Sequence, residues 1–368
     1  MKNVKIIAAE EISRDQRVLK EAKYIYELGY DVEILCWDRE NEFVAKEVEY
    51  IDNVKIKRFF PKSLYGSGWR QIIPFIKFII ELKKHLKNQE YEYLHCQNLD
   101  GFIVGYLINN RKKIIFDMRE FYEGREKNKV KKLVIKNIVR FGIKKSHNII
   151  YVNNTQISNI KQEYRGKLIY LPNYPSELLG KSIKKVETNL LNISYIGGVR
   201  QYDEFKNLFE ATKKIEKIRV NIHGMGTAYN RLKAIEDEYT NVNMTGRYNP
   251  SQTAELYGSS NIIYCVYSMN NENWRTAYPI KFYESIVTKT PIIVSKGSVL
   301  EEFLKENDIG FVVDGDNIEE IRLLIEDIKN NINILDEKVR NLEKIQFEYT
   351  WENVVNNLNF IYKSIESS

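Results

Sequence analysis

A lysine and a glutamate three residues apart, Lys281 and Glu284, form the most informative chemical pair in the sequence. They follow a proline that suits the first turn of a helix, and they precede an apolar, β-branched run at 291–295 that is typical of a buried strand. Residues three apart share one helix face, whereas Phe282 and Ile286, four apart, share another that suits burial against a sheet. The pattern predicts that a cation and a carboxylate face a cleft together; the alternative is an ordinary surface pair.

Glycines and an arginine at the ends of expected strands are the second group of candidates. Gly197 and Gly198 close a strand expected at 191–197, where backbone amides can approach a diphosphate, and Arg200 offers a planar fork of donors. A solvated arginine after a turn is the alternative. Gly224 belongs to a Gly-x-Gly turn that lacks the third glycine of a dinucleotide fingerprint, so we interpret it as a close-packed turn.

A carboxylate cluster ends the strand expected at 112–117. Either Asp117 or Glu120 can orient or deprotonate an acceptor hydroxyl, or one of them holds Arg119 in a structural ion pair. His95 also lies at an expected strand end, where a lone histidine is more often structural. The sequence leaves the choice between Asp117 and Glu120 open.

The sequence contains little that indicates a metal site or a redox-active cysteine. Asp314 and Asp316 form an Asp-x-Asp string, but it follows a late strand and precedes helix-like residues, so we interpret it as a turn and helix cap. The three cysteines are far apart and lack ligand spacing, which predicts buried thiols in a reducing compartment. We expect no metal and no cofactor besides the substrate.

Strand-like and helix-like segments alternate along nearly the whole chain, which predicts parallel sheets covered by helices on both faces. Strands are expected near 3–9, 31–37, 91–96, 112–117, 147–152 and 167–171, with an extended stretch near 47–59, and then near 191–197, 218–223, 241–245, 261–267, 291–295 and 309–313. The predicted fold class is α/β, with two doubly wound, Rossmann-like sheets.

At 368 residues the chain exceeds one comfortable core, so two domains are expected. Two prolines within four residues after the sixth strand mark the boundary. The expected parts are an N-terminal domain at 1–173, a linker at 174–190, a C-terminal domain at 191–345 and a closing segment at 346–368. An amphipathic helix is expected in the closing segment, from about Trp351 to Ser364.

The net charge of +6 is unevenly distributed. Residues 1–173 hold 33 Lys and Arg against 22 Asp and Glu, or +11, which leaves 23 against 28, or −5, for the rest. The basic residues show neither aromatic interleaving nor an RNA-binding motif, so nucleic acid is not an expected partner. The apolar stretch Trp69–Lys84 with its basic residues predicts either peripheral contact with an anionic membrane or a buried core helix. No run reaches transmembrane length and the first apolar stretch is too short for a signal peptide, so the cytoplasm is expected.

The segment from Tyr278 to Ser295 resembles the donor-site helix of retaining GT-B glycosyltransferases of the family 4 type. The family pattern runs Pro-x-Lys-x-aromatic-Glu, then a short helix, then Pro and a hydrophobic strand. The resemblance implies two Rossmann-like domains facing a central cleft, the first binding the acceptor and the second a nucleotide sugar. It also implies that Glu284 accepts hydrogen bonds from the ribose hydroxyls and that Lys281 lies near the diphosphate or the sugar.

Other segments resemble the same family at lower specificity. Gly197, Gly198 and Arg200 match its strand-then-glycine turn with a following basic residue, which implies a phosphate clamp at Arg200. Gly224 and Arg247 match later strand-end turns that border the nucleotide in relatives. The closing segment resembles the one that packs back on the first domain in this family.

The sequence also departs from the family pattern. Thr276 stands eight residues before Glu284, where the fuller motif has a glutamate, and Arg119 takes the place of a histidine. Asp15 and Arg17 lie in a segment that resembles the first βα unit, but its loop lacks the paired glycines of many relatives. Asp15 alternatively caps a helix, and Arg17 is a weaker phosphate candidate.

The expected function is transfer of a sugar from a nucleoside diphosphate sugar to a hydroxyl or lipid-linked acceptor, in cell-surface polysaccharide or glycolipid assembly. The expected catalytic residues are Asp117, Glu120, Arg200 and Lys281. The expected donor-binding residues are Gly197, Gly198, Arg200, Gly224, Arg247, Lys281 and Glu284. The alternatives are a nucleotide-sugar 2-epimerase, which needs acid and base groups on both sides of the sugar, and a noncatalytic GT-B subunit.

Overall fold

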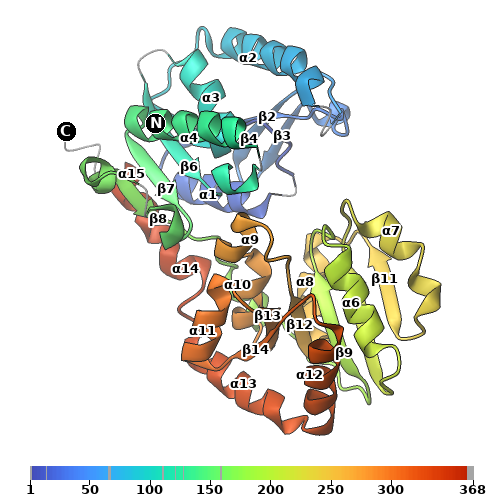
Figure 1. The fold of residues 1–368 in the computed structure, drawn as a ribbon. Coiled ribbons are helices and arrows are strands. Elements are labelled where there is room, and N and C mark those ends of the chain that lie inside the picture. The colour runs from blue at the N-terminus through green and yellow to red at the C-terminus, as the bar shows by residue number, and fades with distance from the viewer. Residues whose placement is uncertain are drawn as a thin grey trace. The chain divides into compact units, whose positions relative to one another are not determined.

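The chain forms two compact units, one built from Met1–Pro172 with Val355–Ser368 and the other from Asn173–Val354. The structure is a computed structural model, and it describes residues 2–13, 15–64, 68–109, 112–120, 122–126, 128–157 and 160–362. Figure 1 labels the elements of both units.

The first unit contains an eight-stranded sheet with strand order β3-β4-β2-β1-β5-β6-β7-β8. The strands are β1 (Asn3–Ala8), β2 (Asp31–Trp37), β3 (Val48–Ile51), β4 (Val54–Phe59), β5 (Tyr93–Gln97), β6 (Lys113–Met118), β7 (Asn148–Tyr151) and β8 (Leu168–Tyr170). Their pairings are parallel except that of β3 with β4. The extended stretch expected near 47–59 is this antiparallel hairpin. Asp52 and Asn53 have φ of 48° and 64° in its two-residue turn, which suits the right-handed twist of paired strands.

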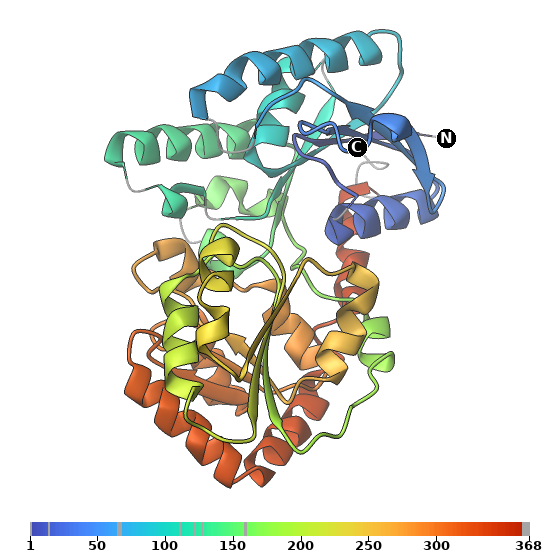
Figure 2. The same ribbon diagram turned by 90° about the vertical axis from the view of Figure 1, so that its right-hand side faces the viewer.

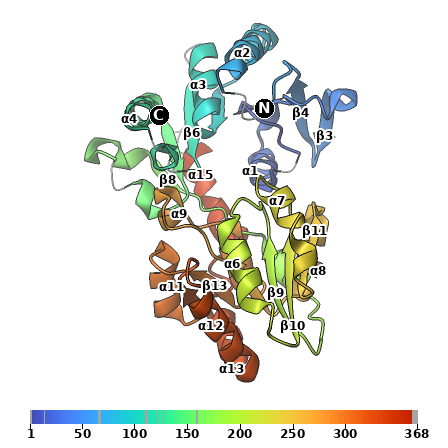
Figure 3. The same cartoon turned by 45° about the vertical axis from the view of Figure 1, so that its right-hand side comes forward.

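Helices cover both faces of this sheet. They are α1 (Gln16–Glu27), α2 (Ile72–Leu86), α3 (Asn98–Ile108), α4 (Lys129–Lys145) and α15 (Leu358–Tyr362). The helices α2, α3 and α4 pack side by side over one hydrophobic core, because Phe78, Phe102 and Val139 point from them into the same buried cluster. Figure 3 shows α1 and α15 on the opposite side of the strands.

The second unit contains a six-stranded parallel sheet with strand order β11-β10-β9-β12-β13-β14. The strands are β9 (Leu191–Ile196), β10 (Ile218–His223), β11 (Val242–Gly246), β12 (Ile262–Cys265), β13 (Ile292–Ser295) and β14 (Gly310–Val313). In chain order this is the doubly wound arrangement 3-2-1-4-5-6, whose direction reverses between β9 and β12. The predicted α/β fold class is confirmed, and every expected strand is present with small shifts at its ends.

Helices again form two layers around this sheet, as Figure 2 shows. The helices α6 (Asp203–Thr212) and α12 (Ile318–Asn330) pack together over one face. The helices α8 (Thr253–Gly258) and α10 (Ile280–Val287) are joined by side-chain contacts described below. The remaining helices are α5 (Glu177–Lys181), α7 (Tyr229–Lys233), α9 (Glu272–Thr276), α11 (Val299–Asn307), α13 (Asn333–Ile345) and α14 (Trp351–Val354).

The closing segment is not the single helix expected from Trp351 to Ser364. Its first turn, α14, ends at Val354, a short 3-10 turn follows, and α15 packs in the first unit, where the Tyr362 hydroxyl lies 2.9 Å from Nδ1 of His95. Lys363 and Ser364 lie outside the described residues. The stretch expected as a linker contains α5 and belongs to the second unit. None of the helices described here is both long enough and apolar enough to cross a membrane.

Candidate functional site

The sheet of the second unit reverses its strand order beside Gly197, the residue that follows β9. Gly197 has φ of 139°, and its N–H donates to the His223 carbonyl at 2.9 Å. A Cβ at this position would lie 3.3 Å from Nζ of Lys281. Glycine therefore serves two purposes here, because it adopts a backbone conformation unfavourable to other residues and it admits the lysine ammonium.

Neighbouring strand ends are joined through Gly224. Its φ is 137°, its N–H donates to the Gly246 carbonyl at 2.7 Å, and a Cβ would lie only 1.8 Å from the Gly197 carbonyl oxygen. The absence of space for a Cβ at Gly224 confirms the prediction of a close-packed turn at this position. Gly198 is exposed, and its N–H has no backbone acceptor among the residues described, whereas the flanking N–H of Val199 donates to Met225 at 3.1 Å.

Lys281 is buried in the first turn of α10, with its ammonium among tyrosines. Nζ donates to the Tyr267 hydroxyl at 2.7 Å and lies 4.3 Å from the centre of the Tyr195 ring. Tyr267 is itself fixed, because its N–H donates to Oγ of Ser295 at 2.7 Å. The lysine charge is thus held at the point where strand order reverses, where doubly wound folds bind ligands.

Glu284 lies one turn along α10 and is half-buried. Its Oε2 accepts a 2.9 Å hydrogen bond from the hydroxyl of Tyr257, a fully buried residue of α8. Burial, together with the negative charge of Glu284, raises the pKa of Tyr248 to about 12, so that phenol stays neutral near the carboxylate. Lys281 and Glu284 therefore each have a tyrosine hydroxyl that fixes their orientation.

Two arginines near these strand ends are exposed. Arg200 follows the β9 turn and Arg247 follows β11, and neither has an ion pair or hydrogen bond within the described part of the chain. A solvated guanidinium can pair with an arriving phosphate without first breaking a protein contact.

The position eight residues before Glu284 is part of a short helix, α9. The Thr276 hydroxyl donates to the Glu272 carbonyl at 3.2 Å, so it serves the helix that it ends. Trp274 stacks on Tyr267 with ring centres 4.4 Å apart and planes 2° apart. At the position where the family motif has a carboxylate this chain has Thr276, and Trp274, two residues earlier, supports the tyrosine that is bound to Lys281.

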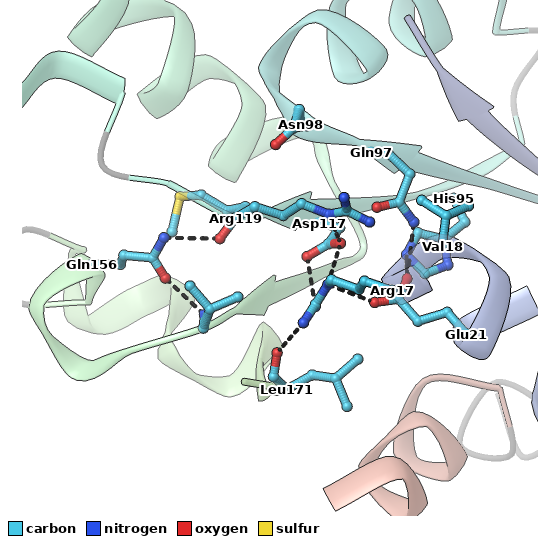
Figure 4. A network of polar contacts seen from close by, with 12 residues as sticks. Arg17, Val18, Glu21, His95, Gln97, Asn98, Asp117, Arg119, Gln156 and Leu171 are labelled. Carbon is cyan, nitrogen blue, oxygen red and sulfur yellow. Dashed lines mark hydrogen bonds and ion pairs between the residues drawn. The ribbon is translucent and has the colours of Figure 1, made fainter. Parts of the chain in front are cut away.

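In the first unit Asp117 lies at the end of β6 with no exposed surface, as shown with its partners in Figure 4. It accepts hydrogen bonds from Arg17 Nη2 at 3.2 Å and from Arg119 Nε at 2.9 Å. Burial alone would raise the pKa of Asp117, but the two guanidinium groups hold it below its ordinary value. A buried carboxylate that is ion-paired on two sides is poorly placed to remove a proton. This geometry therefore favours the interpretation that Asp117 holds Arg119 in a structural ion pair.

Asp15 and Arg17 complete the same network. Asp15 caps α1 by accepting from the N–H groups of Arg17 and Val18, and it also accepts from Arg119 Nη1 at 2.5 Å. Arg17 is buried and donates to the Leu171 carbonyl at 2.9 Å. Arg17 is therefore not available to a phosphate in this arrangement. Glu120, just beyond β6, is half-buried.

Glu21, His95 and Asp117 place potential metal-ligand atoms within 4.8 Å of one another. Arg17 lies 2.8 Å from Glu21 and 3.2 Å from Asp117, so arginine already supplies the positive charge. Burial raises the pKa of Glu21 to about 7 and lowers that of His95 to about 4. These groups form a buried ion-pair network, which disfavours an added cation by repulsion.

The Asp-x-Asp string lies in a turn after β14. The N–H of Asp316 donates to Oδ1 of Asp314 at 3.0 Å, and Asn317 caps α12. This is the local geometry of an Asx turn leading into a helix.

Two family models match the sequence. One, described as glycosyl transferase 4-like, matches residues 15–154, and the other, described as glycosyl transferases group 1, matches residues 181–345. Sucrose-phosphate synthase from Thermosynechococcus elongatus has the same fold, with a TM-score of 0.79 at 13% identity and all of both chains covered. The chain is a GT-B glycosyltransferase of the family 4 type.

Further solved structures share the fold of this glycosyltransferase. Anabaena HepE in complex with UDP and glucose has a TM-score of 0.71 at 10% identity, with all of both chains covered. A putative UDP-N-acetylglucosamine 2-epimerase from Listeria monocytogenes has a TM-score of 0.68 at 11% identity, covering 100% of this chain and 98% of that one. No curated protein sequence matches.

Two supporting residues of the glycosyltransferase could not be selected from the sequence pattern. Tyr257 lies 27 positions before Glu284 and Tyr267 lies 14 before Lys281. Neither spacing belongs to a local motif, because each contact joins different elements of the sheet and its helices. A buried tyrosine is common in any core, so only the three-dimensional contact distinguishes these two.

Proposed function

We propose that this glycosyltransferase moves a sugar from a nucleoside diphosphate sugar to a hydroxyl acceptor, with retention of anomeric configuration and without a metal. The observation that carries the proposal is the position of the Lys281 ammonium beside the Gly197 turn, with Glu284 one helical turn away. A fixed cation at a strand-order reversal suits a diphosphate, and a carboxylate suits the vicinal hydroxyls of a ribose.

Negative charge grows on the departing diphosphate as the glycosidic bond breaks. In our proposal Lys281 and Arg200 stabilise that charge, and the N–H of Gly198 offers a further donor. Glu284 binds the ribose, Arg247 borders the base, and Gly224 keeps the strand-end turns close enough to form the site. A preorganised cation stabilises the transition state without having to reorganise during the reaction.

The acceptor side belongs to the first unit in this proposal. Asp117 supports Arg119 rather than reacting, so Glu120 is the better candidate to orient or deprotonate the acceptor hydroxyl. The fold shared with Anabaena HepE, solved with UDP-glucose, supports a hexose donor on UDP.

We further propose that the protein is cytoplasmic and acts at an anionic membrane surface, in polysaccharide or glycolipid assembly. The support is a group of exposed large apolar side chains on the α2–α4 layer. These are Trp69, Ile72, Ile73, Ile76 and Ile80 at α2, Tyr106 and Leu107 on α3, and Val130, Leu133, Val134 and Phe141 on α4. Lysines and arginines occur among them in α2 and α4, which suits an interface rich in anionic lipid.

The test is a turnover assay of purified protein with a panel of nucleotide sugars, with and without sugar and lipid-linked acceptors. The expected result is nucleoside diphosphate release that requires an acceptor, with a product whose anomeric configuration, read by NMR, matches the donor. Isomerised donor sugar without an acceptor would instead establish the epimerase alternative. Nucleotide binding without any turnover would establish a noncatalytic subunit.

A further inference from the structure

A hollow of about 950 Å³ lies between β4 and α2 in the first unit, away from the residues assigned above. Its walls include the end of β4 with the residues after it, and one face of α2. The side chains on α2 are Pro74, Lys77, Glu81, Lys84 and His85, whose spacing of three or four residues places most of them along one stripe of the helix.

The cations of the hollow fall into two groups. Lys57 is paired with Glu47, and Arg58 is buried with Glu49 at 2.8 Å, so these two charges are neutralised within the protein. The other group comprises Lys62, Lys77 and Lys84, which are exposed and have no ion-pair partner among the described residues. Two carboxylates also line the hollow, Glu47, which is paired with Lys57, and Glu81. The unpaired charge of the hollow is therefore positive.

The apolar face of α2 adjoins this hollow. Ile73, Ile76 and Ile80 each precede a hollow-lining residue by one position, which corresponds to about 100° around the helix. On the other side, Phe78 and Leu82 are buried in the core. The stripe of α2 that lines the hollow, with Lys77 and Lys84, therefore lies between the buried face of the helix and its face of exposed isoleucines.

We propose that this hollow binds the phosphate headgroup of an anionic bilayer lipid while the exposed isoleucines of α2 enter the acyl boundary. A lysine ammonium is a suitable point charge for a phosphate, and an adjacent apolar face fits a ligand whose remainder is hydrocarbon. A soluble phosphate would not make use of the isoleucines. The inference deepens the proposed membrane contact and rests on it, but it does not depend on sugar transfer.

The test is co-sedimentation of the full chain with vesicles of phosphatidylcholine alone or mixed with phosphatidylglycerol. The double variant Lys77→Gln/Lys84→Gln should weaken binding to the anionic vesicles by about tenfold or more. The matched control is Lys83→Gln/Lys87→Gln, which removes the same charge from two exposed positions, one in the last turn of α2 and one just after it, that do not line the hollow. Glu81→Gln should strengthen binding, because it removes the opposing charge.

Equal losses in the two double variants would show diffuse surface attraction and overturn the headgroup site, leaving the membrane contact intact. If the protein does not sediment with anionic vesicles at low salt, both the headgroup site and the membrane contact are overturned. A Lys77- and Lys84-dependent affinity for soluble glycerol phosphate that matches the vesicle affinity would also overturn the lipid assignment.

Trp69 provides a second readout that requires no change in charge. It is 75% exposed immediately before α2, whereas Trp37 and Trp351 are buried. Vesicles with brominated acyl chains should quench its fluorescence, and Trp69→Phe should abolish most of that quenching. Unquenched Trp69 on bound protein would contradict insertion of the α2 face.

Discussion

The hydroxyl of Tyr257 donates a 2.9 Å hydrogen bond to Oε2 of Glu284. The tyrosine is fully buried in α8 and the glutamate is half-buried in α10, so the bond joins two helices at the edge of the proposed nucleotide site. A carboxylate has two oxygens, and a buried donor on one of them fixes the direction in which the other points. Tyr257 is therefore a positioning residue for the proposed ribose contact.

Removal of that hydroxyl should loosen the carboxylate. Tyr257→Phe is expected to weaken nucleotide binding by about 0.5–1.5 kcal/mol, the size of one ordinary hydrogen bond, because the carboxylate loses the donor that orients it toward the ribose. Calorimetric titration of the preferred nucleoside diphosphate measures this. The matched control is Tyr264→Phe, since Tyr264 is equally buried in the same unit and its hydroxyl has no hydrogen-bond partner among the residues that the structure describes. Equal affinities for the two variants would contradict the positioning role.

Truncation of Glu284 itself should cost more. Glu284→Ala is expected to weaken nucleotide binding by about 1–3 kcal/mol, because two ribose hydroxyls lose a charged acceptor. Comparison with the 2′-deoxy nucleotide provides a check, since the deoxy ligand should lose less affinity in the variant than the ribose form does. An unchanged affinity for the ribose nucleotide would rule out the ribose assignment.

Arg200→Ala should lower kcat more than Glu284→Ala does, because the leaving-group charge develops only in the transition state. Arg247→Ala is the natural comparison, since both arginines are exposed beyond strand ends and Arg247 is assigned to the base. Steady-state kinetics should show a kcat effect at Arg200 and a KM effect at Arg247. A rise in KM alone for Arg200→Ala would remove it from the transition-state role.

Substitutions of Asp117, in β6, and of Glu120, just beyond β6, should have different effects on stability and on activity. Asp117→Asn leaves Arg17 and Arg119 without their shared counter-charge and is expected to destabilise the fold by about 3 kcal/mol. Glu120→Gln should lower turnover with little change in Tm. A stable Asp117→Asn variant that has lost turnover would restore Asp117 as the acceptor base.

The contributions of the buried Glu21 and His95 to the stability of the fold should depend on pH in opposite directions. The pKa of Glu21 is raised from 4.5 to about 7, so its contribution to stability is present below pH 4.5 and is lost as pH rises through 7. The pKa of His95 is lowered from 6.5 to about 4, so its contribution is present above pH 6.5 and is lost as pH falls through 4.

Thermal unfolding as a function of pH measures this directly. Relative to the unmodified protein, Glu21→Gln should become progressively more stable from pH 4.5 to 7. His95→Gln should become progressively less stable from pH 4 to 6.5. Parallel curves for all three proteins would show that neither group titrates differently in the folded state.

The sequence alone determined the architecture of this protein. Strand positions, the α/β class and the helix with Lys281 and Glu284 all follow from periodicity and turn residues, which act over a few neighbouring positions. Asp15 as a helix cap is equally local, because its acceptor atoms reach only the next N–H groups of its own chain.

Only the tertiary structure decided what surrounds the chemical groups. Asp117 and Arg17 are 100 residues apart, yet their pairing converts a candidate base into a structural anion. Tyr257 and Tyr267 reach Glu284 and Lys281 from other elements. The sequence pattern showed neither the hollow beside α2 nor the side of that helix that faces solvent. Such contacts depend on how sheets and helices pack, and packing is set by the summed burial of many distant side chains rather than by any local pattern.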